Sequence, residues 1–427
     1  MVFEGIMDYG EMQKIHTYLN LKYGIGIQPY AHLHYPYLSH PHHISGLGRD
    51  IRQCLYQTRS QAFGDILIGE TLAQLHHGDI LVWGHDNQSI AKADSSLEVP
   101  SGIAYRMQRT WRIAETRESD SIRIAFDLQG TAWESLEPRA LVLLVDDDAD
   151  FTDARVIDDP LDSGFRLDLE DGQYLSLGVK EYVKLEMKAI LAGAWDATSG
   201  LMRDDLREQG LVPLLDPYEQ RVKLSPDKLS VSDSDAIVDW VEIRLYDSQD
   251  SSVLHRQAAL LQADGDIVGP DSHSSLLLNV PAGEYFVGLS HRNHLSIMSA
   301  VSVQLDTSSQ VIDFISGNAG GDQPQQELAV ATFGLWPGDA NQDQQLVFQG
   351  SGNDVSKIFL EVLSAADNTS FARDFVLEGY WAADLNLDGK VVFQGAGADV
   401  SLLFLTILSH SGNAGFSRSF VIKSVAP

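Results

Sequence analysis

Residues 338–364 read GDANQDQQLVFQGSGNDVSKIFLEVLS, and this stretch decides how the C-terminal part of the chain folds. The chain repeats it 45 positions later, because residues 339–376 align with residues 384–421 and agree at 20 of 38 positions. Each copy places D-x-N-x-D before a V-F-Q-G segment and then a run with the apolar spacing of an amphipathic helix. Self-similarity at a fixed period marks a repeated structural unit. We therefore expect two like units, each a loop followed by a helix.

Acids and amides at alternate positions of a tight loop supply the oxygen ligands that calcium prefers. The predicted calcium ligands are Asp339, Asn341, Asp343, the carbonyl of Gln345 and Asp354 in the first copy, and Asp384, Asn386, Asp388, the carbonyl of Lys390 and Asp399 in the second. Where such a loop usually closes, both copies have a glycine, and the acid follows four residues later. We expect an extended loop that Asp354 or Asp399 closes.

Two alternatives accompany the calcium sites. Asp354 and Asp399 begin the predicted helices and can instead be N-caps, with the earlier acids forming a solvated turn. The copies also differ at one position, where the first has Gln344 and the second has Gly389, the residue that a sharp turn favours. We expect the first copy to bind calcium more weakly.

Composition limits the class of protein. A chain of 427 residues predicts several domains. Its 60 acidic and 30 basic side chains give a net charge of −30, which argues against nucleic-acid partners. No apolar run is long enough to predict a membrane span. The only cysteine, Cys54, excludes an internal disulfide.

Short alternating segments bounded by turn residues predict strands in most of the remaining chain. Residues 1–180 are expected to form a β-rich sandwich with an N-terminal helix at 8–23, and residues 228–316 a second, Ig-like sandwich. Residues 181–227 are predicted as a connector that carries a strand, VKLEMKAIL, and a short helix around 202–210, and residues 317–332 as a Gly/Gln-rich linker. The repeats occupy 333–427. The fold class is therefore mainly β, with two jelly-roll-like or Ig-like sandwich modules followed by a small helical repeat pair.

The repeats resemble dockerin-like or EF-hand-like calcium repeats of the type GDxNxDGxVxFQGxxND, found in multidomain surface proteins of gliding, type IX-secreting bacteria. Upstream segments such as ISGLGRD, VWGHDN and IVDWVEIRLYD look like modules of the same surface proteins. The resemblance implies structural calcium and an extracellular or cell-surface location. It also likens the opening VFEGI to the last strand of a preceding module, so we expect the chain to be part of a longer protein.

Other polar clusters carry weaker predictions. His32, His34, His40, His42 and His43, and the pair His291 and His294, are zinc candidates, with a surface loop and hydrogen-bonded turn histidines as the alternatives. Asp146, Asp148 and Asp150 predict either a further calcium site or a solvated acidic turn. Trp83, Trp111, Trp195 and Trp240 are expected in the core.

No nucleophile, phosphate-binding or metalloprotease motif is present, so the sequence favours a non-enzymatic protein. We expect a calcium-stabilised structural or adhesive protein that associates with itself, as in a filament, or with other surface-protein modules. The alternative is a carbohydrate-binding or polysaccharide-degradation accessory protein with glycans as partners and a dockerin-like anchor.

Overall fold

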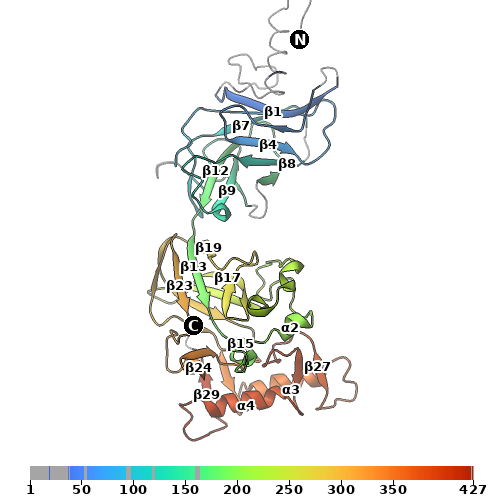
Figure 1. The fold of residues 1–427 in the computed structure, drawn as a ribbon, viewed down its shortest axis with the longest axis vertical. Coiled ribbons are helices and arrows are strands. Elements are labelled where there is room, and N and C mark those ends of the chain that lie inside the picture. The colour runs from blue at the N-terminus through green and yellow to red at the C-terminus, as the bar shows by residue number, and fades with distance from the viewer. Residues whose placement is uncertain are drawn as a thin grey trace, which may run out of the picture. The chain divides into compact units, whose positions relative to one another are not determined.

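The computed structural model describes residues 19, 37, 39–51, 55–92, 98–117, 121–158, 164–424 and 426. VFEGI, His32, His34 and Cys54 lie outside these residues, and of the helix predicted at 8–23 only Leu19 is described, in helical conformation. Strands account for 38% and helices for 11%, so the mainly β prediction is confirmed. The chain divides into two compact units, Met1–Glu181 and Tyr182–Pro427, each taken by itself below (Figure 1).

Unit one contains an eight-stranded sheet of order β10-β9-β12-β7-β5-β1-β2, with β6 on β12, and a four-stranded sheet of order β11-β8-β4-β3. The six segments with the clearest alternation in the sequence form β4, β5, β7, β8, β9 and β12. The strands are β1 His42–Asp50, β2 Leu55–Gln57, β3 Arg59–Ser60, β4 Leu67–Thr71, β5 Ile80–His85, β6 Ile103–Arg106, β7 Trp111–Glu115, β8 Ile122–Phe126, β9 Leu141–Asp146, β10 Arg155–Ile157, β11 Phe165–Leu167 and β12 Tyr174–Lys180.

Two tryptophans connect the sheets of unit one. Trp83 of β5 is fully buried and lies against Gly69 of β4, where an added Cβ would come within 2.4 Å of the indole ring. Trp111 of β7 packs edge-on against Phe126 of β8 with ring centroids 5.5 Å apart. Burial of such large side chains is a main source of folding free energy. The core prediction for Trp83 and Trp111 is confirmed.

Unit two is built on a nine-stranded sheet of order β19-β13-β18-β17-β16-β20-β21, with β22 on β20 and β23 on β13. All its pairings are antiparallel except β13 with β23. Trp240 of β16 is fully buried in its core. The elements up to residue 313 are β13 Val183–Lys188, β14 Trp195–Asp196, β15 Leu201–Met202, α2 Asp205–Glu208, β16 Ile237–Asp247, β17 Val253–Gln262, β18 Asp266–Val268, β19 Leu276–Leu278, β20 Gly283–Ser290, β21 Ile297–Met298, β22 Val303–Leu305 and β23 Ser309–Asp313.

Two predicted boundary segments contain strands. The range expected to be a connector begins with β13, whose apolar face Val183, Leu185 and Met187 is buried in the core of the nine-stranded sheet. The range expected to be a linker contains β24 Gln325–Ala329, which forms a hairpin with β25 Thr332–Leu335. The strand VKLEMKAIL is therefore confirmed, whereas the composition of 317–332 suggested a spacer although its side chains pair with the next segment.

The repeats form two helices, α3 Asp354–Ser364 and α4 Asp399–Ser409, and four short strands. Strand β26 Gln345–Val347 follows the first loop and pairs with β29 Val421–Lys423, which ends the second copy. Strand β28 Lys390–Val392 follows the second loop and pairs with β27 Val376–Glu378, which ends the first copy. Phenylalanines of one copy also pack against those of the other. The ring centroids are 5.0 Å apart for Phe348–Phe404 and 4.8 Å apart for Phe359–Phe393. Each copy therefore supplies the strand partner and the aromatic partner of the other.

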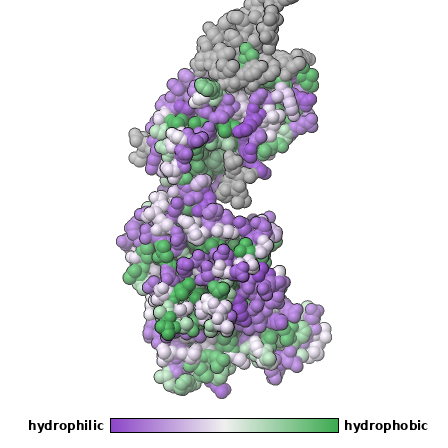
Figure 2. Space-filling model, viewed as in Figure 1, coloured by the Kyte–Doolittle hydropathy of each residue, from purple (hydrophilic) through white to green (hydrophobic). Residues whose placement is uncertain are grey.

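The surface of the described chain fits the acidic composition. Figure 2 shows hydrophilic residues over much of the face in view, with hydrophobic residues scattered among them. In the repeats, large apolar side chains are exposed at matching positions, namely Leu360 with Leu405 and Phe371 with Phe416. Among the residues described, none of the helices has the length and apolar character to span a bilayer.

Helix α4 offers a matched test of this packing. Leu403 is fully buried between the copies, whereas Leu405 on the same helix is 61% exposed. We expect Leu403→Ala to lower the free energy of unfolding of unit two by about 2–5 kcal/mol, because it leaves a cavity in the shared core. Leu405→Ala should change it by no more than about 0.5 kcal/mol. Urea denaturation of both variants measures this, and equal losses would contradict the packing described.

Candidate metal sites

The first loop of the repeats is organised by two acids. Asp339 accepts the N–H groups of Asp343 at 2.9 Å and Gln344 at 3.0 Å, one on each carboxylate oxygen. Asp354, the first residue of α3, turns its carboxylate back into the loop. There it accepts the N–H groups of Val347 at 2.8 Å and Asn341 at 3.3 Å. Both acids thus hold the loop backbone in place.

The second loop repeats this arrangement. Asp384 accepts the N–H groups of Asp388 at 3.1 Å and Gly389 at 2.9 Å. Asp399, the first residue of α4, accepts those of Leu385 and Val392, both at 2.8 Å. The four-residue extension in each copy therefore does bring the later acid back to the loop that begins with the earlier one.

The N-cap alternative for Asp354 and Asp399 is wrong. The N-cap of α3 is Asn353, whose side chain accepts the N–H of Ser356 at 2.9 Å. The N-cap of α4 is Ala398, which offers no side-chain acceptor. Both aspartates stand one residue later, inside the first turn, where a negative charge also interacts favourably with the helix dipole.

These four acids are buried, and the one basic residue that acts clearly on them is Arg292, whose charge lowers the pKa of Asp384 against the effect of burial. Asp339 and Asp399 are 1% exposed, and Asp354 and Asp384 are fully buried. No ion pair joins any of them to a Lys, Arg or His among the residues that the structure describes. Burial, reinforced by the neighbouring loop acids, raises the pKa of Asp339, Asp354 and Asp384 to about 7 and that of Asp399 to about 8. A buried carboxylate needs a compensating charge, and each loop contains two.

The remaining predicted ligands lie at the rim of the loops. Asn341 donates to Asp343 at 3.2 Å, and Asn386 donates to Asp388 at 3.0 Å. Asp343 is exposed and Asp388 is half-buried. Gln345 and Lys390, whose carbonyls are predicted ligands, are the first residues of β26 and β28. The sequence prediction therefore selected residues that lie together in two loops.

The donor set of each loop fits a hard cation, because it consists of three carboxylates, one amide and backbone carbonyls. The loop acids do not converge on one point. Within the described chain, only two other groups, His43–Asp65–His85 and Asp146–Asp148–Asp150, bring three acid or imidazole ligand atoms within 4.8 Å of one another. The buried oxygens of the loops are turned towards backbone N–H groups. The rim carboxylates of Asp343 and Asp388 are also engaged, since they accept the N–H groups of Gln345 and Lys390, each at 3.0 Å.

Gln344 and Gly389 show how the copies differ. Both have a left-handed backbone, with φ of 63° and 80°, so Gln344 adopts a conformation that favours glycine. Gln344 offsets this by donating its amide to Asp339 at 3.3 Å and accepting the N–H of Ser296 at 3.1 Å. At Gly389 an added Cβ would lie 2.7 Å from Leu211 Cδ1 and 2.8 Å from Gln209 Oε1, so a larger residue would require these two side chains to shift.

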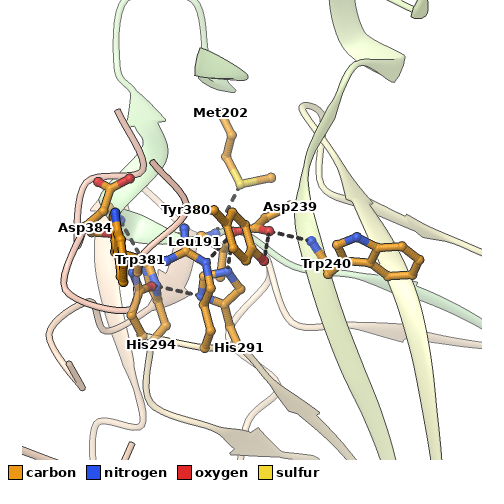
Figure 3. Close-up of polar contacts among 12 residues, drawn as sticks. Leu191, Met202, Asp239, Trp240, His291, His294, Tyr380, Trp381 and Asp384 are labelled. Carbon is orange, nitrogen blue, oxygen red and sulfur yellow. Dashed lines mark hydrogen bonds and ion pairs between the residues drawn. The ribbon is translucent and has the colours of Figure 1, made fainter. Parts of the chain in front are cut away.

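A buried polar cluster, the hub, lies beside the second loop and consists of Asp239, His291, Arg292, Asn293, His294 and Tyr380. Asp239 of β16 accepts hydrogen bonds from Tyr380 at 2.6 Å and His291 at 3.1 Å, as Figure 3 shows. It also accepts from Arg292 Nε at 3.0 Å. Burial alone would raise the pKa of Asp239, but Arg292, His291 and Tyr380 lower it to about 2. The hub therefore holds a buried ion pair.

The hub histidines are engaged in hydrogen bonds at both ring nitrogens. His294 Nε2 accepts the N–H of Gly193 at 3.1 Å, so its proton lies on Nδ1. That nitrogen is 2.7 Å from the side-chain oxygen of Asn293 and 3.1 Å from His291 Nδ1. His291 then donates from Nε2 to Asp239. Burial lowers the pKa of both histidines. This geometry agrees with turn histidines and leaves no ring nitrogen for zinc.

The described part of the histidine tract in unit one, His40, His42 and His43, does not form a surface loop. His40 is buried, and His42 and His43 open β1, where a bulge gives His43 a φ of 46°. His43 Nδ1 lies 3.1 Å from Nε2 of His85, a residue the sequence prediction missed because it comes from β5. Asp65 lies 3.9 Å from the same nitrogen. Spacing along the chain could not have shown this grouping.

Hydrogen bonding opposes a metal at this group. His85 Nδ1 accepts the N–H of Asn87 at 2.9 Å, which places the ring proton on Nε2, the nitrogen facing His43. A neutral imidazole cannot offer both nitrogens as lone pairs. Asp65 is already engaged by Trp111 Nε1 at 2.9 Å and by Arg109 at 3.5 Å. Burial, with Arg109 next, lowers the pKa of His85 to about 2. The group is a hydrogen-bonded network around an uncharged His85 ring.

The acidic turn after β9 brings Asp146, Asp148 and Asp150 within 4.8 Å of one another. Their carboxylates support the turn itself. Asp146 accepts the N–H of Phe151 at 2.8 Å, and Asp150 accepts from Thr152 N–H and hydroxyl at 2.8 and 2.6 Å. The alternatives of a calcium site and a solvated turn both remain compatible with this geometry.

Comparison with known proteins gives one match. A family described as a domain of unknown function, DUF8202, matches residues 11–173, which include the histidine network and the acidic turn of unit one. No curated protein and no solved structure matches the chain. The sites in the repeats lie outside the matched residues.

The raised carboxylate pKa values predict a pH effect in chelator. The folded state retains protons on the four buried loop acids up to about pH 7–8, whereas the unfolded chain loses them near pH 4. The free energy of unfolding should therefore fall as pH rises from about 6.5 to 9. At pH 6.5 about half of the unfolded histidines still carry a proton, whereas above about pH 7.5 roughly nine-tenths of them are neutral, so the upper part of the range isolates the carboxyl groups.

Thermal melts of the full chain in chelator across this pH range measure the effect. A calcium series provides the control, since a bound cation replaces the protons and should remove the decline. A melting temperature that rises with pH in chelator would contradict the assignment.

Proposed function

We propose that this protein is a non-enzymatic extracellular or cell-surface structural or adhesive protein whose C-terminal repeats bind calcium, one ion per loop. The single observation that carries the proposal is the pair of buried carboxylates in each loop, Asp339 with Asp354 and Asp384 with Asp399, which form no ion pair with a Lys, Arg or His among the described residues. Leaving charge buried and unpaired is costly, and a divalent cation is the simplest compensation.

The resemblance to dockerin-like repeats supports the same assignment. Asp339, Asn341 and Asp343, with Asp384, Asn386 and Asp388, would contribute side-chain oxygens, and Asp354 and Asp399 the closing carboxylates. The carbonyls of Gln345 and Lys390 would complete the sets. Calcium held there would neutralise the loops and fix the adjoining β26 and β28.

We infer a mechanical role from the elements that the loops connect, which are the paired strands of the two copies and the hub. Each loop leads into a strand that pairs with the other copy, and the second loop borders the hub. A cation that binds only the folded loops stabilises all of these contacts by mass action. In this proposal calcium keeps the repeats rigid, and the protein associates with itself or with other surface-protein modules.

Loss of one loop charge at the rim tests calcium binding. Asp343→Asn and Asp388→Asn each remove a predicted ligand while keeping a side-chain acceptor for the N–H of Gln345 or Lys390. Saturating calcium at about 100 times Kd should raise the wild-type melting temperature of unit two by about 5–10 °C per site. Each variant should lose most of the gain from its own loop, yet melt in chelator at the wild-type temperature or slightly higher.

Asp367→Asn is the matched control, since Asp367 is an exposed acid of the first copy outside both loops. It changes the net charge equally and should retain the full calcium shift. Absence of any calcium shift in the wild type would refute the proposal, and so would equal losses in calcium and in chelator.

A cavity favours glycan binding as a second candidate function. It has a volume of about 400 Å³ and lies between the β24–β25 hairpin and the end of α4. Its lining combines amides, hydroxyls and an aromatic ring, including Gln325, Gln326, Phe333, Ser409 and Ser411. Such groups suit sugar hydroxyls and ring faces.

A glycan array with the full chain tests this candidate. Binding that disappears in Gln326→Ala, whose side chain is half-buried in the lining, but not in Gln304→Ala, would support it. A blank array would leave the structural role as the better account.

A further inference from the structure

One residue of the hub lies between the two loops. The backbone oxygen of Asn293 accepts the N–H groups of Gly338 at 3.0 Å and Asp339 at 3.1 Å, at the start of the first loop. Its side-chain Nδ2 donates to the backbone oxygen of Asp384, at the start of the second loop. Asn293 is fully buried, and its side-chain oxygen is fixed by His294. A single residue therefore holds the first ligand position of both loops.

The second loop is further attached to the part of unit two that precedes the repeats. Arg203 Nη2 donates to the carbonyl of Asn386 at 2.8 Å, and Gln209 Nε2 donates to that of Asp388 at 2.9 Å. Arg292 Nη1 donates to the carbonyl of Trp381. At Gly193 the backbones approach so closely that an added Cβ would lie 2.1 Å from the carbonyl oxygen of Leu385. These donors fix the backbone of the second loop.

The first loop is attached through the same turn. Ser296, three residues after Asn293, donates its N–H to the side chain of Gln344 at 3.1 Å. Movement of the turn at 291–296 would therefore displace Asp339 and Gln344 in one loop and Asp384 in the other. Because close packing does not deform continuously, the turn favours both loops being ordered together.

We propose that the two loops fill with calcium cooperatively and that Asn293 is the positioning residue that couples them. The inference rests on the calcium binding proposed above and adds how the two sites regulate each other. A cation that orders Asp339 in the first loop fixes the Asn293 peptide, and the Asn293 side chain then holds the Asp384 carbonyl for the second cation. By reciprocity, filling the second loop raises the affinity of the first by the same factor.

Calorimetric titration of the full chain with calcium tests the coupling. Asp343→Asn and Asp388→Asn give proteins in which one loop at a time is impaired, so each reports the association constant of the other loop. For the wild type, the product of the two stepwise constants should exceed the product of these single-loop constants by about fivefold or more. In the same set of proteins carrying Asn293→Ala, the two products should agree within about twofold.

Asn318→Ala is the matched control, because Asn318 also donates its amide to a backbone carbonyl, that of Asp313 at 3.0 Å, but contacts neither loop. With Asn318→Ala, the product of the stepwise constants should exceed the product of the single-loop constants by the same factor as in the wild type. If Asn293→Ala does not give a cooperative melt in calcium, Asn293→Ser, which retains a hydroxyl for His294, takes its place.

The outcomes separate the two proposals. A wild type that binds no calcium overturns the proposed function. If the wild type binds two ions but the product of its stepwise constants equals the product of the single-loop constants, calcium binding stands and the coupling is overturned. An excess that persists in the Asn293 variants overturns the role of Asn293 and assigns the coupling to the exchanged strands.

Discussion

The buried carboxylate of Asp239 is the constraint on which the architecture of unit two depends. A charge with no exposure to water requires partners in fixed positions, and here Asp239 and its partners come from three separate segments. Asp239 belongs to β16, Arg292 and His291 to the turn after β20, and Tyr380 to the stretch between the two repeats. Satisfying one carboxylate therefore requires the nine-stranded sheet and the repeats to be in register with each other. Removing any one partner leaves charge or polar atoms uncompensated in a dry interior.

This buried charge links the repeats to the rest of unit two. A helical calcium module at the end of a multidomain chain suggests an appendage on a flexible linker. Instead, the segment predicted as linker forms a hairpin, Leu335 packs in the core of the nine-stranded sheet, and Asn293 reaches into both loops. The stability of the sheet and the order of the loops are therefore linked. Any ligand of the loops acts on unit two as a whole.

The features that depend on local sequence pattern could be predicted from the sequence. Alternation in WVEIRLY and the short apolar run LVLLVD correctly indicated strands, and the 45-residue period correctly located two loop–helix units. The linker prediction for 317–332 missed β24, because Gly and Gln lower local propensity without preventing pairing to the next segment. The partnership of His43 with His85, and of Asp239 with His291 and Tyr380, is set by sheet register and by contacts between distant segments. No spacing rule in a single sequence encodes these contacts, whereas the loop acids are close in the chain and could be grouped in advance.

The exchange of strands between the repeats has a consequence for their origin. Val347 pairs with Val421 and Val392 with Val376, so each copy offers the other the same pair of surfaces that it receives. That relation is the one found in an isologous dimer, in which identical patches meet about a two-fold axis. A single ancestral copy would have had an unpaired loop strand and an unpaired tail, and a second identical chain would have satisfied both. The covalent pair thus has the geometry of a symmetric dimer fused into one polypeptide, and fusion freed the two halves to diverge at positions such as Gln344 and Gly389.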